Sequence, residues 1–60
     1  MPDYVLYCLD GSKLVRCERF RASDDEAALR EAHRRRGSQA AELWCGPHRV
    51  RSFARETVLS

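Results

Sequence analysis

Two side chains capable of metal binding or nucleophilic chemistry, Cys45 and His48, stand on either side of a Gly-Pro pair. Their spacing is that of half a structural zinc site, because zinc takes four tetrahedral ligands and binds both thiolate sulfur and imidazole nitrogen. Cys8 and Cys17 supply the other two ligands only if the fold brings all four side chains together. The Cys-x-x-Cys knuckle usual for structural zinc is absent, so we expect reduced cysteines and no metal ion.

The same Cys45–His48 pair could also form an activated thiolate nucleophile. A chain of 60 residues leaves little room for a substrate pocket, and the sequence contains neither a Gly-rich phosphate loop nor a serine nucleophile elbow. Asp24 and Asp25 resemble a catalytic carboxylate pair, but a place at the start of a helix explains them. We therefore expect no catalytic residues, no cofactor and no enzymatic activity.

A basic cluster near the middle of the chain is the second candidate site. It consists of Arg30, Arg34, Arg35 and Arg36. Clustered guanidinium groups suit phosphates, so weak nucleic-acid binding is one hypothesis. The alternative is that these cations complement the negative end of a helix dipole. The net charge of +2 is too small to favour nucleic acid by itself.

Length and composition predict one small domain whose hydrophobic core alone gives little stability. A domain of this size buries only about 60% of the surface that its unfolded chain exposes. We expect an ordered core over about residues 3–55 and a tail over residues 56–60 that frays. There is no apolar run long enough for a membrane helix and no basic leader followed by an apolar stretch, which favours a cytoplasmic protein.

The stretch from Tyr4 to Leu9 is apolar or aromatic at every position, which predicts a central strand covered on both sides. After turn residues at 10–13, a second strand is expected over 14–21, at an edge of the sheet. Val15 and Cys17 would share its inward face, and a bulge near Glu18 or Arg19 would return Phe20 to that face.

A helix is expected from a capping box at residues 23–26 to Arg36, with Gly37 ending it. In the capping box, the Ser23 hydroxyl accepts from a backbone N–H and the Glu26 side chain reaches back. Acids at its start and basic residues at its end fit the helix dipole. Two more strands, over 40–45 and 48–53, flank a Gly-Pro turn.

These elements predict an α+β domain of order β-β-α-β-β, with a four-stranded antiparallel sheet and one helix on one face. The two most apolar strands, the first and third, should be neighbours, giving the order 2-1-3-4, while 1-2-3-4 and 2-1-4-3 remain open. One helix covers one face, so the other face exposes large apolar residues, and a homodimer or another protein partner would cover them. The candidate interface residues are Tyr4, Leu6, Tyr7 and Trp44.

Three segments carry a resemblance to a family. They are Tyr4-x-Leu6-Tyr7-x-Leu9-Asp10, then Asp24-Asp25-Glu26-Ala27-Ala28, then Glu42-Leu43-Trp44 before a Gly turn and a basic strand. Together they resemble short bacterial proteins of unknown function, mostly from alphaproteobacteria. The resemblance spans residues 4 to about 55 and implies a bacterial cytoplasmic protein without catalytic residues. Cys17 and Cys45 depart from it, since an alanine or polar residue is expected there.

Overall fold

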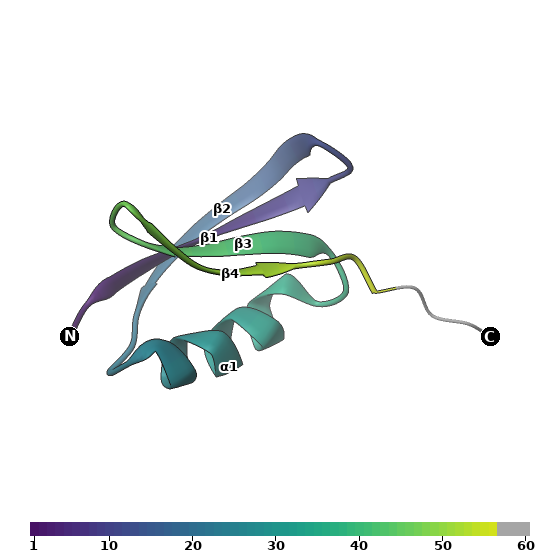
Figure 1. Ribbon diagram of the computed structural model, residues 1–60. Helices are drawn as coiled ribbons and strands as arrows, with labels where there is room; N and C mark the ends of the chain where they lie inside the picture. The colour runs from purple at the N-terminus through teal and green to yellow at the C-terminus, as the bar shows by residue number, and fades with distance from the viewer. Residues whose placement is uncertain (57–60) are drawn as a thin grey trace.

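The computed structural model describes residues 1–56, and its elements follow the predicted order β-β-α-β-β (Figure 1). The strands are β1 (Asp3–Asp10), β2 (Lys13–Arg21), β3 (Ala40–Cys45) and β4 (His48–Phe53), and the helix is α1 (Asp25–Arg36). Of the predicted fraying tail, residues 57–60 lie outside the described residues. Its first residue, Glu56, is bonded to the loop after α1, since the Glu56 backbone N–H donates to the Ser38 carbonyl at 3.0 Å.

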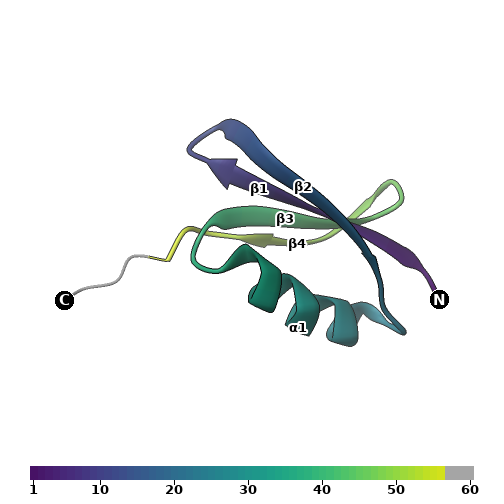
Figure 2. The same cartoon turned by 180° about the vertical axis from the view of Figure 1, so that it is seen from behind.

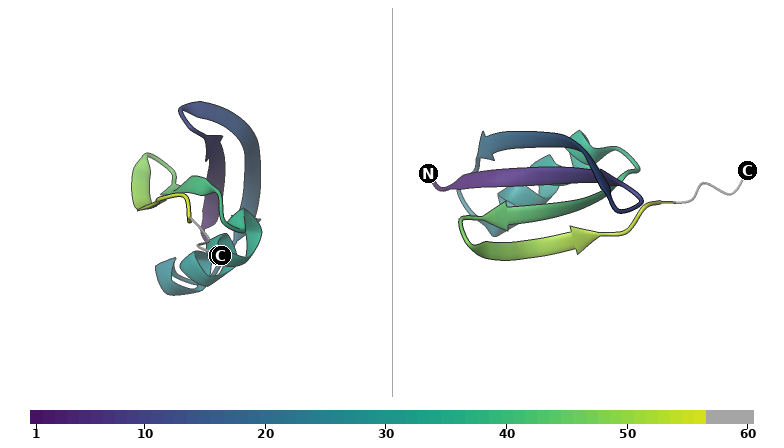
Figure 3. Two further views of the ribbon diagram at one scale, coloured as in Figure 1. Left: turned by 90° about the vertical axis from the view of Figure 1, so that its right-hand side faces the viewer. Right: turned by 90° about the horizontal axis from the view of Figure 1, so that it is seen from above.

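The four strands form one antiparallel sheet in the order β2-β1-β3-β4, which confirms the predicted order (Figure 3). The two central strands are the two most apolar ones, because a central strand has neighbours on both sides and little contact with water. The outer strands β2 and β4 carry most of the sheet's arginines.

Helix α1 lies against one face of the sheet and leaves the other face uncovered (Figure 2). The core lies between α1 and this covered face. Its buried apolar residues are Tyr4, Leu6, Cys8, Phe20, Ala22, Ala28, Ala32, Ala41, Leu43 and Phe53. The prediction that β1 is covered on both sides therefore holds only for its helix side, because Val5, Tyr7 and Leu9 on the opposite side are half-buried.

The predicted phase of β2 is wrong, because its bulge lies earlier than expected. Cys8 pairs with Arg16 and Leu9 pairs with Leu14, so the extra residue is Val15. The bulge turns Arg16 toward the helix, and Val15 is 46% exposed instead of inward.

After this shift, β2 keeps a regular alternation to its end. Phe20 pairs with Tyr4 and stacks on its ring, with ring centroids 5.9 Å apart. Glu18, also on the helix side, accepts a hydrogen bond from Arg35 at 3.0 Å. Cys17 is exposed on the opposite side. The end of α1 gives the charged residues of β2 polar partners, so no second bulge is needed before Phe20.

The start of α1 also differs from the expected capping box. Asp24, not Ser23, is the N-cap residue, and its carboxylate accepts from the Ala27 backbone N–H at 2.8 Å. The Asp24 carbonyl accepts the first helical hydrogen bond, from the Ala28 N–H at 3.0 Å. The helix ends at Arg36 as predicted, and Gly37 follows with φ of 63°, which glycine adopts without steric cost.

One partly buried hydrogen bond joins the start of α1 to the central strand β1. The Tyr4 hydroxyl donates to the Asp25 carboxylate at 2.7 Å, while the Tyr4 ring is 1% exposed. This hydrogen bond, together with burial, raises the pKa of Tyr4 to about 12. Burial of the ring and hydrogen bonding of the hydroxyl thus fix how the first turn of α1 sits on β1.

The cap geometry leads to a prediction that separates Asp24 from Ser23. Asp24→Ala should lower the free energy of unfolding by about 1 kcal/mol, because it removes the acceptor for the Ala27 N–H. Ser23→Ala, the matched control, should leave it nearly unchanged. Urea unfolding followed by circular dichroism measures both. A larger loss in the Ser23 variant would contradict the cap assignment.

The Tyr4–Asp25 hydrogen bond predicts a loss of stability at alkaline pH. Tyrosine in the unfolded chain titrates near pH 10. Because folded Tyr4 holds its proton up to about 12, the unfolded chain releases it first, and stability falls as pH rises between these values. Tyr4→Phe lacks this effect.

Urea unfolding of both proteins at roughly pH 9 and pH 11.5 tests this prediction. The stability difference between the native protein and the Tyr4→Phe variant should shrink at the higher pH. The two proteins differ only in the Tyr4 hydroxyl, so the comparison isolates its contribution. A difference that stays constant with pH would contradict the assignment.

Candidate functional site

The face of the sheet away from α1, called the open face below, gathers half-buried and exposed apolar side chains with a few charged ones. Cross-strand pairing identifies its members, because directly paired residues point to the same side of a sheet. They include Val5, Tyr7 and Leu9 of β1, Leu14, Cys17 and Arg19 of β2, Glu42 and Trp44 of β3, and Arg49 and Ser52 of β4.

The structure divides the four predicted interface residues between the two faces. Tyr4 and Leu6 are 1% and 0% exposed and lie against α1, so they are not on the open face. Tyr7 and Trp44 are half-buried on the open face. The alternation of side chains along a strand predicts that Tyr4 and Leu6 face one side of β1 and that Tyr7 faces the other. The sequence did not show which of these two sides the helix would cover.

Beside its apolar residues, the open face also carries polar groups and both signs of charge. The Trp44 indole N–H donates to the Glu42 carboxylate at 3.0 Å, and the Arg49 guanidinium lies 4.0 Å from the same carboxylate. On the far side of β1, Arg19 makes no ion pair within residues 1–56. The open face therefore carries both an acceptor, the Glu42 carboxylate, and a cation, Arg19, that makes no ion pair within residues 1–56.

The apolar part of the open face continues beyond β1 into the start of β2. Leu14 pairs with Leu9 and is 51% exposed, and the bulged Val15 beside it is 46% exposed. The sequence interpretation missed Val15, because it placed the bulge later in β2. The signal available was the pairing of Leu9 with Leu14 across the turn, after which one extra residue brings Phe20 onto Tyr4.

The edges of the sheet are poorly suited to pairing with another strand. Each outer strand has a bulge, at Val15 in β2 and at Val50 in β4. Lys13, Arg21 and Arg51 on these strands are exposed. Bulges and exposed charges are the usual protection of an edge strand against pairing. The open face, rather than an edge, is therefore the surface available to a partner.

Three of the four predicted nucleic-acid-binding arginines are engaged with acidic side chains on the protein surface. Arg30 pairs with Glu26 at 3.3 Å, and Arg34 and Arg35 both pair with Glu31. These hydrogen bonds from Arg34 and Arg35 hold the pKa of Glu31 below its ordinary value. Arg35 also lies over the Phe20 ring, 4.9 Å from its centroid, which ties the helix to β2.

The fourth, Arg36, is 4% exposed and serves as an internal connector. Its guanidinium donates to the backbone carbonyls of Gln39 at 2.7 Å and Ala54 at 3.4 Å, and pairs with Glu56 at 2.8 Å. It also lies over the Phe53 ring at 4.7 Å. These contacts join the end of α1, the loop after it and the segment after β4, and they leave Arg36 inaccessible to a phosphate.

The four candidate zinc ligands do not converge. Cys8 is buried beneath α1, Cys17 is exposed on the open face, and Cys45 pairs with His48 at the far end of β3 from Cys8. Within residues 1–56, no group of three or more His, Cys, Asp or Glu side chains is placed to hold a metal ion. Cys45 and His48, which were considered as an activated thiolate pair, are paired in the register of β3 and β4, but no hydrogen bond joins their side chains within residues 1–56.

Buried Cys8 has a cationic neighbour that the sequence did not suggest. The bulge at Val15 turns Arg16 inward, and its guanidinium donates to the Cys8 sulfur at 3.4 Å and to the Arg35 carbonyl. Arg16 also pairs with Glu18 at 2.8 Å. This side chain therefore bridges β2 to the carbonyl end of α1, where a cation complements the helix dipole.

In the described part of the chain, α1 is neither long enough nor apolar enough to cross a membrane. Comparisons with protein-family models, with curated proteins and with solved structures give no match. The resemblance to short bacterial proteins therefore stays a prediction.

The burial of Arg36 predicts that it contributes more to the free energy of unfolding than the exposed Arg34. Arg36→Gln should lower the free energy of unfolding by about 2 kcal/mol, since it removes charge-assisted hydrogen bonds to two carbonyls and to Glu56. Arg34→Gln, the control at an exposed ion pair, should change it by less than about 0.5 kcal/mol. Urea unfolding compares them, and equal effects would contradict the connector role.

Proposed function

We propose that this protein is a non-enzymatic interaction or regulatory module that forms a homodimer through its open face. The observation that carries the proposal is the apolar side of the central strands, where Val5, Tyr7, Leu9 and Trp44 are half-buried and no second layer formed by residues 1–56 covers them. A contiguous apolar patch on a small protein usually marks an interface.

The distribution of charge favours a second copy as the occupant. In a two-fold dimer the same surface faces itself, so an attractive interface must contain both partners of each polar contact. The open face meets this condition, because Glu42 accompanies Arg19 and Arg49 on the same surface. A face with arginines alone would repel its own copy.

The size of the open face sets the expected affinity. Four strands about 4.8 Å apart, each with about six residues at roughly 3.3 Å per residue, span roughly 400 Å². Standard stable interfaces bury about 800 Å² per partner, so this dimer is a small one. We expect a dissociation constant in the micromolar range and face-to-face packing of the two sheets.

The proposal includes a cytoplasmic location. All three cysteines are free thiols, and Cys17 is exposed. Exposed free thiols are typical of reducing compartments. No role for nucleic acid is included, because Arg36 is buried and Arg30, Arg34 and Arg35 are paired with glutamates.

Sedimentation equilibrium of the full chain tests the dimer. At about 100 μM we expect mainly twice the 6.9 kDa subunit mass, with dissociation on dilution. Tyr7→Lys should weaken association roughly tenfold or more, because it places a charge at the centre of the interface. Ala54→Lys adds the same charge at an exposed position outside the open face and should leave association unchanged.

Two results would overturn the proposal. One is a mass of 6.9 kDa at all concentrations up to about 1 mM, where even a weak interface would associate. The other is a Tyr7→Lys variant that associates like the native protein. Purified protein that carries nucleic acid, released only at high salt, would favour the arginines at the end of α1 instead.

A further inference from the structure

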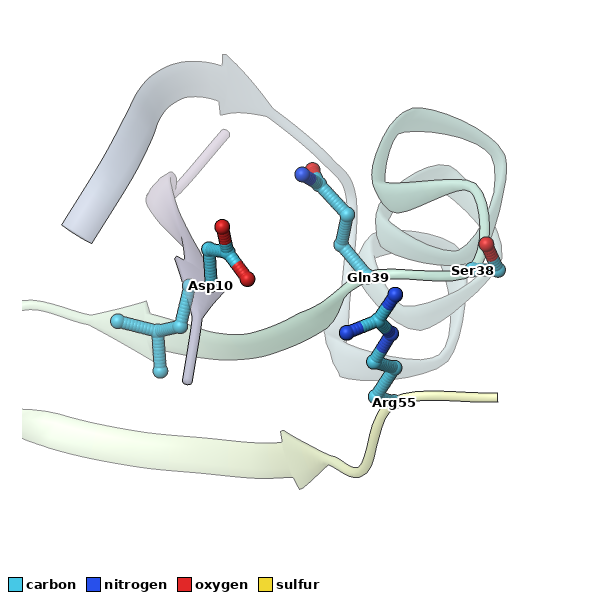
Figure 4. A pocket seen from close by; sticks show the side chains of 5 residues that line it. Asp10, Ser38, Gln39 and Arg55 are labelled. Carbon is cyan, nitrogen blue, oxygen red and sulfur yellow. The ribbon is translucent and has the colours of Figure 1, made fainter. Parts of the chain in front are cut away.

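A second feature lies just beyond the end of α1 and away from most of the open face. A pocket of about 180 Å³ opens where the end of β1, the loop between α1 and β3, and the segment after β4 meet (Figure 4). Its lining residues are Leu9, Asp10, Ser38, Gln39 and Arg55. Only Leu9 also belongs to the open face, so a ligand here and a partner there would occupy different surfaces.

The walls of this pocket are held by the buried Arg36. Its guanidinium donates to the carbonyl of Gln39, which lines the pocket, and to the carbonyl of Ala54, the residue before Arg55. The Gln39 N–H donates to the Arg36 carbonyl at 3.1 Å, and the Glu56 N–H donates to the Ser38 carbonyl at 3.0 Å. The Glu56–Ser38 backbone hydrogen bond and the Arg36 side chain thus fix the two loop segments to each other before any ligand arrives.

The side chains around the pocket carry opposite charges that do not neutralise each other directly. The Asp10 carboxylate, the Gln39 amide and the Arg55 guanidinium come from three different segments around the pocket (Figure 4). Within residues 1–56, neither Asp10 nor Arg55 forms an ion pair, and the Gln39 amide makes no side-chain hydrogen bond. An acceptor, a donor fork and an amide that offers both therefore face one small space.

We propose that this pocket binds a free α-amino acid, with its ammonium group on Asp10 and its carboxylate on Arg55. A purely anionic ligand would meet Asp10 and a purely cationic ligand would meet Arg55, so a zwitterion is the class that satisfies both. The Gln39 amide donates to the ligand carboxylate or accepts from its ammonium group. The pocket volume restricts the ligand to a small side chain, for which Leu9 offers an apolar wall.

The affinity should be low, because the ligand has few atoms and the pocket is open to water. A dissociation constant of roughly a few millimolar is expected for a ligand of about six non-hydrogen atoms. Such an affinity suits a response to the abundance of a free amino acid rather than permanent retention of one.

Titration of the ¹⁵N-labelled full chain with L-alanine tests the proposal by NMR. Amide shifts that saturate should be confined to residues 9–10, 38–39 and 55. Asp10→Asn and Arg55→Gln should each weaken binding roughly tenfold or abolish it. Arg51→Gln, which removes an exposed arginine of β4 outside the pocket, should bind like the native protein. Preserved dispersion of the remaining amide signals shows that each variant is folded.

Two analogues test the zwitterion on the native protein without any substitution. N-acetyl-L-alanine lacks the ammonium group and L-alanine methyl ester lacks the carboxylate, so both should bind at least several-fold more weakly. Shifts that do not saturate, or N-acetyl-L-alanine binding as well as L-alanine, would overturn the proposal. The Tyr7→Lys variant should bind L-alanine normally, which separates this result from the outcome of the dimer test.

Discussion

Ala28 and Ala32 are fully buried between α1 and the sheet, and this close contact is what the remaining structure depends on. Small side chains let the helix approach the sheet, so that Leu6 and Leu43 on β1 and β3 become inaccessible to water. A larger residue at either alanine would hold the helix away and expose the apolar surface that stabilises the fold. The helix contributes little apolar area itself, and its value is that it covers the area of the strands.

Around this contact, arginine side chains cover apolar surface at the edge of the core, a role that aliphatic residues have in larger proteins. Arg35 and Arg36 lie over the rings of Phe20 and Phe53, so their stems and planar heads cover apolar surface at the rim of the core. Arg35 forms ion pairs with Glu18 and Glu31, and Arg36 forms one with Glu56. A cluster that resembles a phosphate-binding patch in the sequence is thereby largely used to close a small core.

Much of the architecture followed from local patterns. The apolar run of β1 predicted a central strand, the turn residues set the two hairpins, and Gly37 marked the helix end. The pairing of Leu9 with Leu14 across the turn was the only local signal for an early bulge, and its position at Val15 is fixed by Phe20 stacking on Tyr4 and by Arg16 donating to the Arg35 carbonyl. These are contacts between elements, and strand periodicity contains no information about them.

The candidate sites were less predictable for the same reason. All four of Tyr4, Leu6, Tyr7 and Trp44 were predicted to lie at an interface, but the side of β1 that the helix covers buries Tyr4 and Leu6 and leaves Tyr7 and Trp44 on the open face. Ser23 and Asp24 are both good N-cap residues, and the choice between them depends on where the chain leaves β2. Asp10 and Arg55 are 45 positions apart in the chain, and only the folded sheet brings them to one pocket.

The chain has a single tryptophan, and its indole N–H donates to Glu42 on the open face. Indole emission is sensitive to the polarity around the ring, so the intrinsic fluorescence of this molecule originates from the very surface whose occupancy is in question. Water leaving that surface would move the emission to shorter wavelength, and the protein therefore carries its own optical reporter without any attached dye.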